Sequence, residues 1–179
     1  MTVLILFATI EGQTGKIARF AETEVRKAGR NAVLVDVADG TELVSFEGVG
    51  TVILAAPVHE RRHPKEFEAF LADHRRELEE RSTLLISVSL KAAFPEGMED
   101  AGDYVTEMKM RTGFTPSAEA LVAGAVRTAS YDYFATEVVR QVVLRGRDHD
   151  PDAGEQEFTD WNALSREILG FLAREVTST

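Results

Sequence analysis

The sequence predicts an α/β fold in which one parallel sheet lies between two layers of helices. Short, almost continuously apolar runs alternate along the whole chain with longer segments whose apolar residues recur at helical spacing. The apolar runs are rich in branched residues, which is typical of parallel strands with both faces buried. Because strand-helix-strand connections are nearly always right-handed, we expect a five-stranded parallel sheet of order 2-1-3-4-5.

The strands are expected at residues 2–8, 32–37, 51–56, 84–89 and 119–125. Helices are expected at residues 13–28, 64–80, 99–111 and 160–176. The first helix has an apolar stripe made of Ile17, Phe20, Ala21, Val25 and Ala28. The second has one made of Phe67, Phe70, Leu71, His74 and Leu78. Pro64 fits the first position of the second helix, and Thr159 is the expected N-cap of the last one.

Length and composition limit the possible classes of protein. A chain of 179 residues is sufficient for one domain with a substantial core, so we expect a single domain over residues 1–179. The net charge of -10 argues against a nucleic-acid-binding protein. Cysteine is absent, which excludes disulfides and thiolate catalysis. The opening "MTVLILFAT" is apolar, but it is too short for a signal peptide and lacks the basic start and the cleavage site of one, so we expect a cytoplasmic protein.

In a sheet of this order, ligands bind beyond the carboxyl ends of the strands, beside strands one and three. The loops at residues 9–14, 57–63 and 89–95 should therefore form the site. The first loop, "TIEGQTGK", brings hydroxyl groups and free backbone N–H groups to the start of a helix, where the helix dipole favours an anion. It is a candidate phosphate cradle, although its spacing is not that of a P-loop. The alternative is that Thr9, Gly12 and Thr14 only form a turn and a cap.

The segment "LILFATIEGQTGKIA" resembles the phosphate loop of the flavodoxin-like superfamily. The whole chain is similar to the bacterial quinone-dependent protoporphyrinogen IX dehydrogenases, with further likeness in "ISVSL", "AGAVR" and "FTDW". This resemblance implies a flavodoxin-like three-layer sandwich that binds FMN and acts as an oxidoreductase of haem biosynthesis. The flavin would take hydride from a porphyrinogen and pass electrons to a quinone or another acceptor.

The resemblance also implies which residues hold the cofactor. The FMN phosphate would be bound, mostly through backbone N–H groups, by Thr9, Ile10, Glu11, Gly12, Gln13 and Thr14. The flavin ring would lie between two further groups of residues: Pro57, Val58, His59 and Glu60, and Ser89, Leu90 and Lys91. Basic side chains near the cleft, Arg61, Arg62, Lys91 and Arg127, are candidates to bind the substrate's propionates. The alternative for each of them is a solvated surface charge.

The stretch "HERRH", residues 59–63, has the H-E-x-x-H pattern of zinc proteases, which requires a helix. Here the stretch follows a strand and is flanked by Pro57 and Pro64, so we expect no metal site and place His59 and Glu60 near the ring. An exposed polar turn is the alternative.

An extra segment at about residues 127–158 precedes the last helix. Its part 127–147 interleaves apolar residues with arginines, a pattern that fits peripheral contact with a membrane, packing on the domain, or a homodimer contact.

Three functions therefore stay open. The first is the porphyrinogen-oxidising flavoenzyme, and the second is an FMN electron carrier without its own substrate. The third is a partner-binding domain that has lost its flavin.

Overall fold

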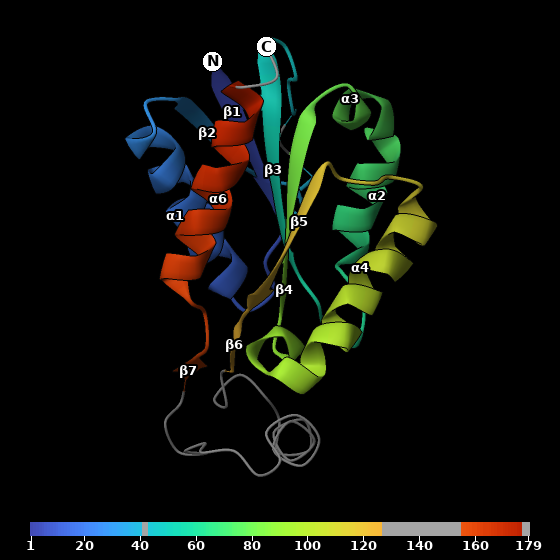
Figure 1. The fold of residues 1–179 in the computed structure, drawn as a ribbon. Coiled ribbons are helices and arrows are strands. Elements are labelled where there is room, and N and C mark those ends of the chain that lie inside the picture. The colour runs from blue at the N-terminus through green and yellow to red at the C-terminus, as the bar shows by residue number, and fades with distance from the viewer. Residues whose placement is uncertain (41–42, 127–154, 177–179) are drawn as a thin grey trace.

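The structure is a computed structural model that describes residues 1–40, 43–126 and 155–176. It confirms the predicted fold class: a five-stranded parallel sheet of order β2-β1-β3-β4-β5 lies between helices (Figure 1). The strands of this sheet are β1 (Thr2–Phe7), β2 (Asn31–Asp36), β3 (Val49–Pro57), β4 (Ser82–Ser89) and β5 (Ala118–Ala123). Phe7 is paired with Ala55, and Ala55 with Ile86, so the carboxyl ends of the three central strands meet at one edge.

The helices form two layers, one on each face of the sheet. One layer consists of α1 (Gln13–Lys27) and α6 (Trp161–Val176) (Figure 1). The other consists of α2 (Lys65–Asp73), α3 (Arg75–Glu79) and α4 (Met98–Thr112). Two short 3₁₀ helices, η1 (Lys91–Ala93) and η2 (Pro95–Gly97), connect β4 to α4. Among the described residues, no helix combines the length and the apolar character needed to cross a membrane.

The core is divided by the sheet because successive side chains of a strand point to opposite faces. Ile5, Ile53 and Ile86 pack on the α1/α6 side, whereas Leu6, Leu54 and Leu85 pack on the α2/α4 side. The central strands are therefore buried on both faces, as predicted.

The prediction of full burial is wrong for the two edge strands. In β2, Val33 is 47% exposed, and exposed or half-buried positions make up most of the strand. In β5, Ala120 and Val122 are buried while Glu119 is exposed. An edge strand has a neighbour on one side only, so the helical layers cover it less completely than they cover the central strands.

The expected helix at residues 64–80 is divided in two at His74, whose N–H still donates to the carbonyl oxygen of Phe70 at 3.0 Å. The predicted apolar stripe persists across the break, with Phe67, Leu71 and Leu78 buried. Pro64 precedes the first helical residue, with an extended ψ of 137°, so its placement at the first helical position is wrong.

Two smaller predictions about the helices are also wrong. Ala28, expected on the buried stripe of α1, is exposed because the helix ends at Lys27. Thr159 does not cap α6. Its hydroxyl donates to the carbonyl oxygen of Ala123 at 2.7 Å, and the Asp160 side chain accepts instead from the Ala163 N–H at 2.9 Å.

A two-stranded antiparallel ribbon joins β6 (Ala125–Val126) to β7 (Gln156–Glu157) beside the carboxyl end of β5 (Figure 1). Of the expected extra segment at about 127–158, only residues 155–158 are described. The predicted membrane or dimer contact at residues 127–147 lies outside the described residues.

Candidate functional site

A cleft opens at the carboxyl ends of the strands, where the three predicted loops come together. Most of the residues expected to hold a cofactor line it. The lining comprises Thr9, Ile10, Glu11, Gln13, Thr14, Pro57, Val58, His59, Val88, Ser89, Leu90, Gly124 and Ala125. Gly12, Glu60 and Lys91 are not among the lining residues. Val88, Gly124 and Ala125 were not predicted to line the cleft. Gly124 and Ala125 follow β5, whose carboxyl end reaches the same edge of the sheet, and they could have been included on that ground.

The loop at residues 9–14 has the geometry of an anion cradle. Gly12 has a φ of 94°, a left-handed conformation that favours glycine, and its N–H donates to the Thr9 hydroxyl at 2.9 Å. Helix α1 begins at the next residue. Its N-cap residue, Gly12, has no side chain that could accept a hydrogen bond from the first N–H groups of the helix. The first N–H groups of a helix have no intrahelical partner, and the helix dipole adds positive potential there. The donor set of this loop therefore fits a phosphate group.

Gln13 links this cradle to the segment that precedes α6. Its side chain is buried, and its Nε2 donates to Glu157 Oε1 at 2.7 Å and to Thr159 Oγ1 at 3.0 Å. The hydrogen bond from Gln13 holds the pKa of Glu157 below its ordinary value, so this carboxyl group is ionised at neutral pH. The late residues of the chain thus help to shape the first loop.

The stretch "HERRH" forms a tight turn. The N–H of His59 donates to the carbonyl oxygen of Arg62 at 2.9 Å, and the reverse bond measures 3.0 Å. The two central residues, Glu60 and Arg61, both have positive φ, 49° and 65°, as in a type I′ turn. His59 is exposed at the cleft, while His63 is buried, so the two histidines do not share a helical face. In the described part of the chain, no group of three or more metal-binding side chains occurs.

The basic side chains near the cleft have acidic neighbours. Arg61 lies over the ring of Tyr104 and 3.6 Å from Glu107, and it stays 64% exposed. Lys91 pairs with Asp100 at 2.7 Å. Arg62 pairs with the buried Glu68, and Arg127 lies outside the described residues. Of the three described candidates, Arg61 is the most exposed.

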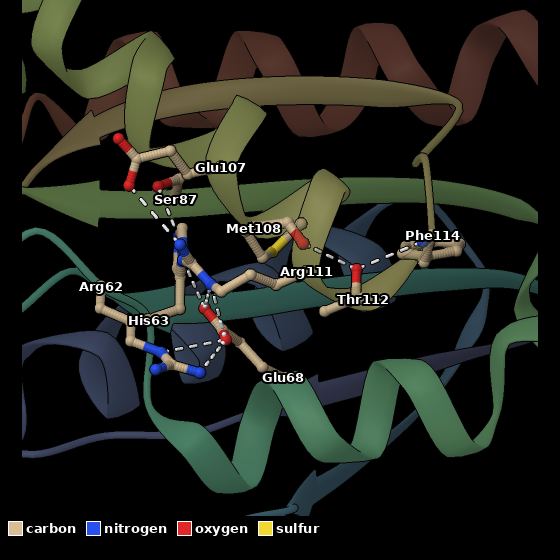
Figure 2. Close-up of polar contacts among 9 residues, drawn as sticks. All are labelled: Arg62, His63, Glu68, Ser87, Glu107, Met108, Arg111, Thr112 and Phe114. Carbon is tan, nitrogen blue, oxygen red and sulfur yellow. Dashed lines mark hydrogen bonds and ion pairs between the residues drawn. The ribbon is translucent and has the colours of Figure 1, made fainter.

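A polar cluster of Arg62, Arg111 and the buried Glu68 connects the loop at residues 57–63 to α2 and α4 (Figure 2). Glu68 of α2, 5% exposed, accepts hydrogen bonds from Arg62 at 2.9 and 3.1 Å and from Arg111 of α4 at 2.8 to 3.2 Å. Burial works to raise the pKa of Glu68, but the bonds from the two arginines outweigh it and lower the pKa. This cluster was not predicted from the sequence. The available signal was a glutamate beside Phe67 and three positions before Leu71, on the buried side of an amphipathic helix.

His63 lies beside this cluster and contacts β4. The imidazole is 1% exposed, and its Nε2 lies 2.9 Å from the Ser87 hydroxyl on β4. Its buried Nδ1 has no hydrogen-bond partner among the described residues. Burial lowers the pKa of His63 to about 4, so the ring is neutral at physiological pH.

The low pKa of His63 predicts a loss of stability in mild acid. Between the ordinary pKa of 6.5 and about 4, the unfolded chain binds a proton that the folded chain does not bind, so stability falls as pH falls through this window. From pH 7 to 4.5, the free energy of unfolding should fall by about 2 kcal/mol more in the wild type than in His63→Gln, by the pKa difference. Urea unfolding across this pH range measures both proteins. If the free energy of unfolding fell equally with pH in the wild type and in His63→Gln, the low pKa of His63 would be contradicted.

Comparisons with known proteins agree with the fold. A family model described as "Flavodoxin domain" matches residues 4–152. Protoporphyrinogen IX dehydrogenase (quinone) of Escherichia coli (strain K12) is 25% identical over 177 residues, which cover 98% of this chain and 94% of the relative.

Two solved structures share the fold. A short-chain flavodoxin associated with a non-canonical PDU bacterial microcompartment has a TM-score of 0.59 at 11% identity, over 97% of this chain and 98% of that chain. Oxidised Flavodoxin 1 from Bacillus cereus has a TM-score of 0.55 at 16% identity, with the same coverage of the two chains.

Proposed function

Because the chain belongs to the flavodoxin domain family, we propose that it is an FMN-dependent oxidoreductase that oxidises protoporphyrinogen IX and uses a quinone as electron acceptor. The observation that carries this proposal is the cleft, where an anion cradle and two further loops meet at the carboxyl edge of the sheet. The near full-length similarity to a protoporphyrinogen IX dehydrogenase supports the choice of substrate.

The residues of the cleft fit FMN. Backbone N–H groups of residues 9–14 would bind the phosphate at the start of α1. The ring would lie between residues 57–60 and residues 89–91. Bound FMN would supply the redox chemistry, while the chain orients the two reactants and keeps water from the ring.

Substrate binding is assigned to the basic side chains beside the cleft. The propionates of a porphyrinogen are carboxylates, for which arginine is a good partner. Arg61 is the best placed of the described candidates, since its contact with Glu107 is long and its side chain is largely exposed. Arg62 would contribute with the part of its guanidinium group that Glu68 does not use, and Arg127 would complete the set.

An electron carrier without its own substrate is the second candidate. The net charge of -10 favours it, because an acidic surface suits docking on basic redox partners. The two functions differ in one reaction: the enzyme forms fluorescent protoporphyrin IX from the porphyrinogen when a quinone is present, whereas the carrier does not.

The first test is a fluorescence titration of the apoprotein with FMN and, separately, with riboflavin. We expect tight quenching of FMN and binding of riboflavin at least about tenfold weaker, because only FMN can use the phosphate cradle. Anaerobic incubation of the loaded protein with protoporphyrinogen IX and a soluble quinone then separates enzyme from carrier. If neither flavin binds, both redox functions are wrong, and a partner-binding domain is the conclusion.

A further inference from the structure

Five charged side chains near the cleft form one chain of contacts. Arg61 Nη2 lies 3.6 Å from Glu107 Oε1, and Glu107 Oε2 lies 3.5 Å from Arg111 Nη1. Arg111 also donates to Glu68 through Nε and Nη2, at 2.8 to 3.2 Å. Glu68 Oε2 in turn accepts from Arg62 at 2.9 and 3.1 Å (Figure 2). The two adjacent arginines of the turn are therefore linked through a third arginine on α4.

The spacing of residues on α4 explains how Arg111 reaches both carboxylates. Glu107 and Arg111 are four positions apart, so they lie on one face of the helix. Tyr104, three positions before Glu107, shares this face, and Arg61 lies over its ring, 5.4 Å from the centroid. Glu68 comes from the neighbouring helix α2. Arg111 thus lies between a carboxylate of its own helix and one of α2.

The ends of this chain of contacts are more accessible than its centre. Arg61 and Arg62 are 64% and 45% exposed, whereas Arg111 is 31% exposed. The contact of Arg61 with Glu107 is longer than a hydrogen bond. Arg62 uses two of the five N–H groups of its guanidinium for Glu68. An anion can therefore reach both arginines of the turn, whereas all three nitrogens of the Arg111 guanidinium contact the two carboxylates.

The balance of charge along the chain of contacts depends on Arg111. With it, three guanidinium groups share two carboxylates, so one positive charge is in excess and favours an anionic ligand. Without it, each arginine of the turn would face one carboxylate, and the charges of each pair would cancel. The ion pair of Lys91 and Asp100 interacts with Arg61, but it adds no net charge. Glu60 belongs to the same turn, and its exposure lets water and salt screen its charge.

We propose that Arg111 is a positioning residue for the substrate: it holds the two carboxylates and thereby keeps Arg61 and Arg62 available to bind carboxylate groups of the ligand. Arg111 does not belong to the lining of the cleft, so it acts through its neighbours. This role rests on the proposed oxidation of a porphyrinogen, whose propionates are the carboxylates in question. It adds a specificity determinant on α4 to the substrate contacts assigned to the turn.

The first test compares Arg111→Met with the wild type, both loaded with FMN, in fluorescence titrations with two probes. The probes are protoporphyrin IX and its dimethyl ester, in which both carboxylates are blocked. In the wild type, protoporphyrin IX should bind at least about tenfold more tightly than the ester. In Arg111→Met, the affinity for protoporphyrin IX should fall by about tenfold, as for the loss of one hydrogen bond to a charged group, while that for the ester changes by less than about twofold.

A second substitution tests the balance of charge directly. In the double variant Arg111→Met, Glu107→Gln, two arginines again share one carboxylate, so the excess positive charge is restored. We expect the affinity for protoporphyrin IX to return to within about threefold of the wild type. A purely structural loss would not be repaired by the removal of another charged contact. Arg111→Lys keeps the charge but not the fork of donors, so it should retain part of the wild-type affinity.

Arg75→Met is the matched control, because it removes the same charge from another place. Arg75 lies on α3, is 50% exposed and pairs with Glu79 at 3.5 Å. Its replacement should leave the affinities for both porphyrins as in the wild type. The affinity for FMN should stay within about twofold in every variant, because the phosphate cradle lies at the start of α1. With protoporphyrinogen IX as substrate, KM should rise in Arg111→Met while kcat stays unchanged.

The outcomes separate the alternatives. An unchanged affinity for protoporphyrin IX in Arg111→Met, or no recovery in the double variant, would overturn the role of Arg111 and leave the proposed function intact. Equal wild-type affinities for protoporphyrin IX and its ester would do the same. Equal losses for protoporphyrin IX, its ester and FMN in Arg111→Met would show that Arg111 only stabilises the fold. A wild type that binds FMN but neither porphyrin would overturn the proposed substrate together with this role.

Discussion

Replacing Glu68 with alanine is expected to lower the free energy of unfolding by about 3 kcal/mol, as found when one partner of a buried ion pair is removed. The carboxylate of Glu68 is 5% exposed and is the shared acceptor of Arg62 and Arg111 (Figure 2). Without it, two guanidinium groups face each other without their common counter-charge, and His63 lies beside them. The arginines are 45% and 31% exposed, so water relieves part of the cost, and the loss should stay at the lower end of the range.

Urea unfolding followed by circular dichroism measures this loss, with two variants as controls. Glu68→Gln keeps the size and one oxygen acceptor but not the charge, so it should lose about half as much stability. Glu66→Ala removes an exposed glutamate from the same first turn of α2 and should lose at most about 0.5 kcal/mol. Equal losses in Glu68→Ala and Glu66→Ala would show that solvent alone satisfies the two arginines.

The fold could be predicted because its signals are local. Apolar runs such as residues 51–56 and 84–89 are longer than any turn and too uniformly apolar for a surface helix, and the handedness of the crossovers then restricts the sheet order. The strand order was therefore correct. Burial of β2 and β5 was overestimated because a sequence run does not reveal whether its strand lies at an edge of the sheet.

The cleft was largely predictable for the same reason, since its loops follow strands whose order was known. The contacts that connect distant residues were not predictable. Glu68 and Arg111 are 43 positions apart, and Gln13 and Glu157 are 144 apart. No periodicity links such pairs. The cap of α6 depends on long-range contacts of the same kind. The Thr159 hydroxyl is hydrogen-bonded to Ala123 and Gln13, and the Asp160 side chain caps the helix instead.

Replacing Gly12 with valine is expected to reduce FMN affinity by about a hundredfold. A φ of 94° is strained for any residue with a side chain and most of all for a β-branched one, at about 3 kcal/mol. The loop will relax to negative φ, and the turn closed by the bond from the Gly12 N–H to Thr9 will open. The N–H groups at the start of α1 then no longer converge on one phosphate.

Gly170→Val is the matched control, because Gly170 lies inside α6, a Cβ there meets no atom within 4 Å, and valine is no worse than glycine in a helix. Its FMN affinity should equal that of the wild type. Riboflavin, which lacks the phosphate, should lose less than about threefold in Gly12→Val, since the ring contacts come from the other two loops. The Gly12 variant is thus expected to abolish the preference for FMN over riboflavin. A preserved preference in Gly12→Val would mean that the phosphate is bound somewhere other than the start of α1.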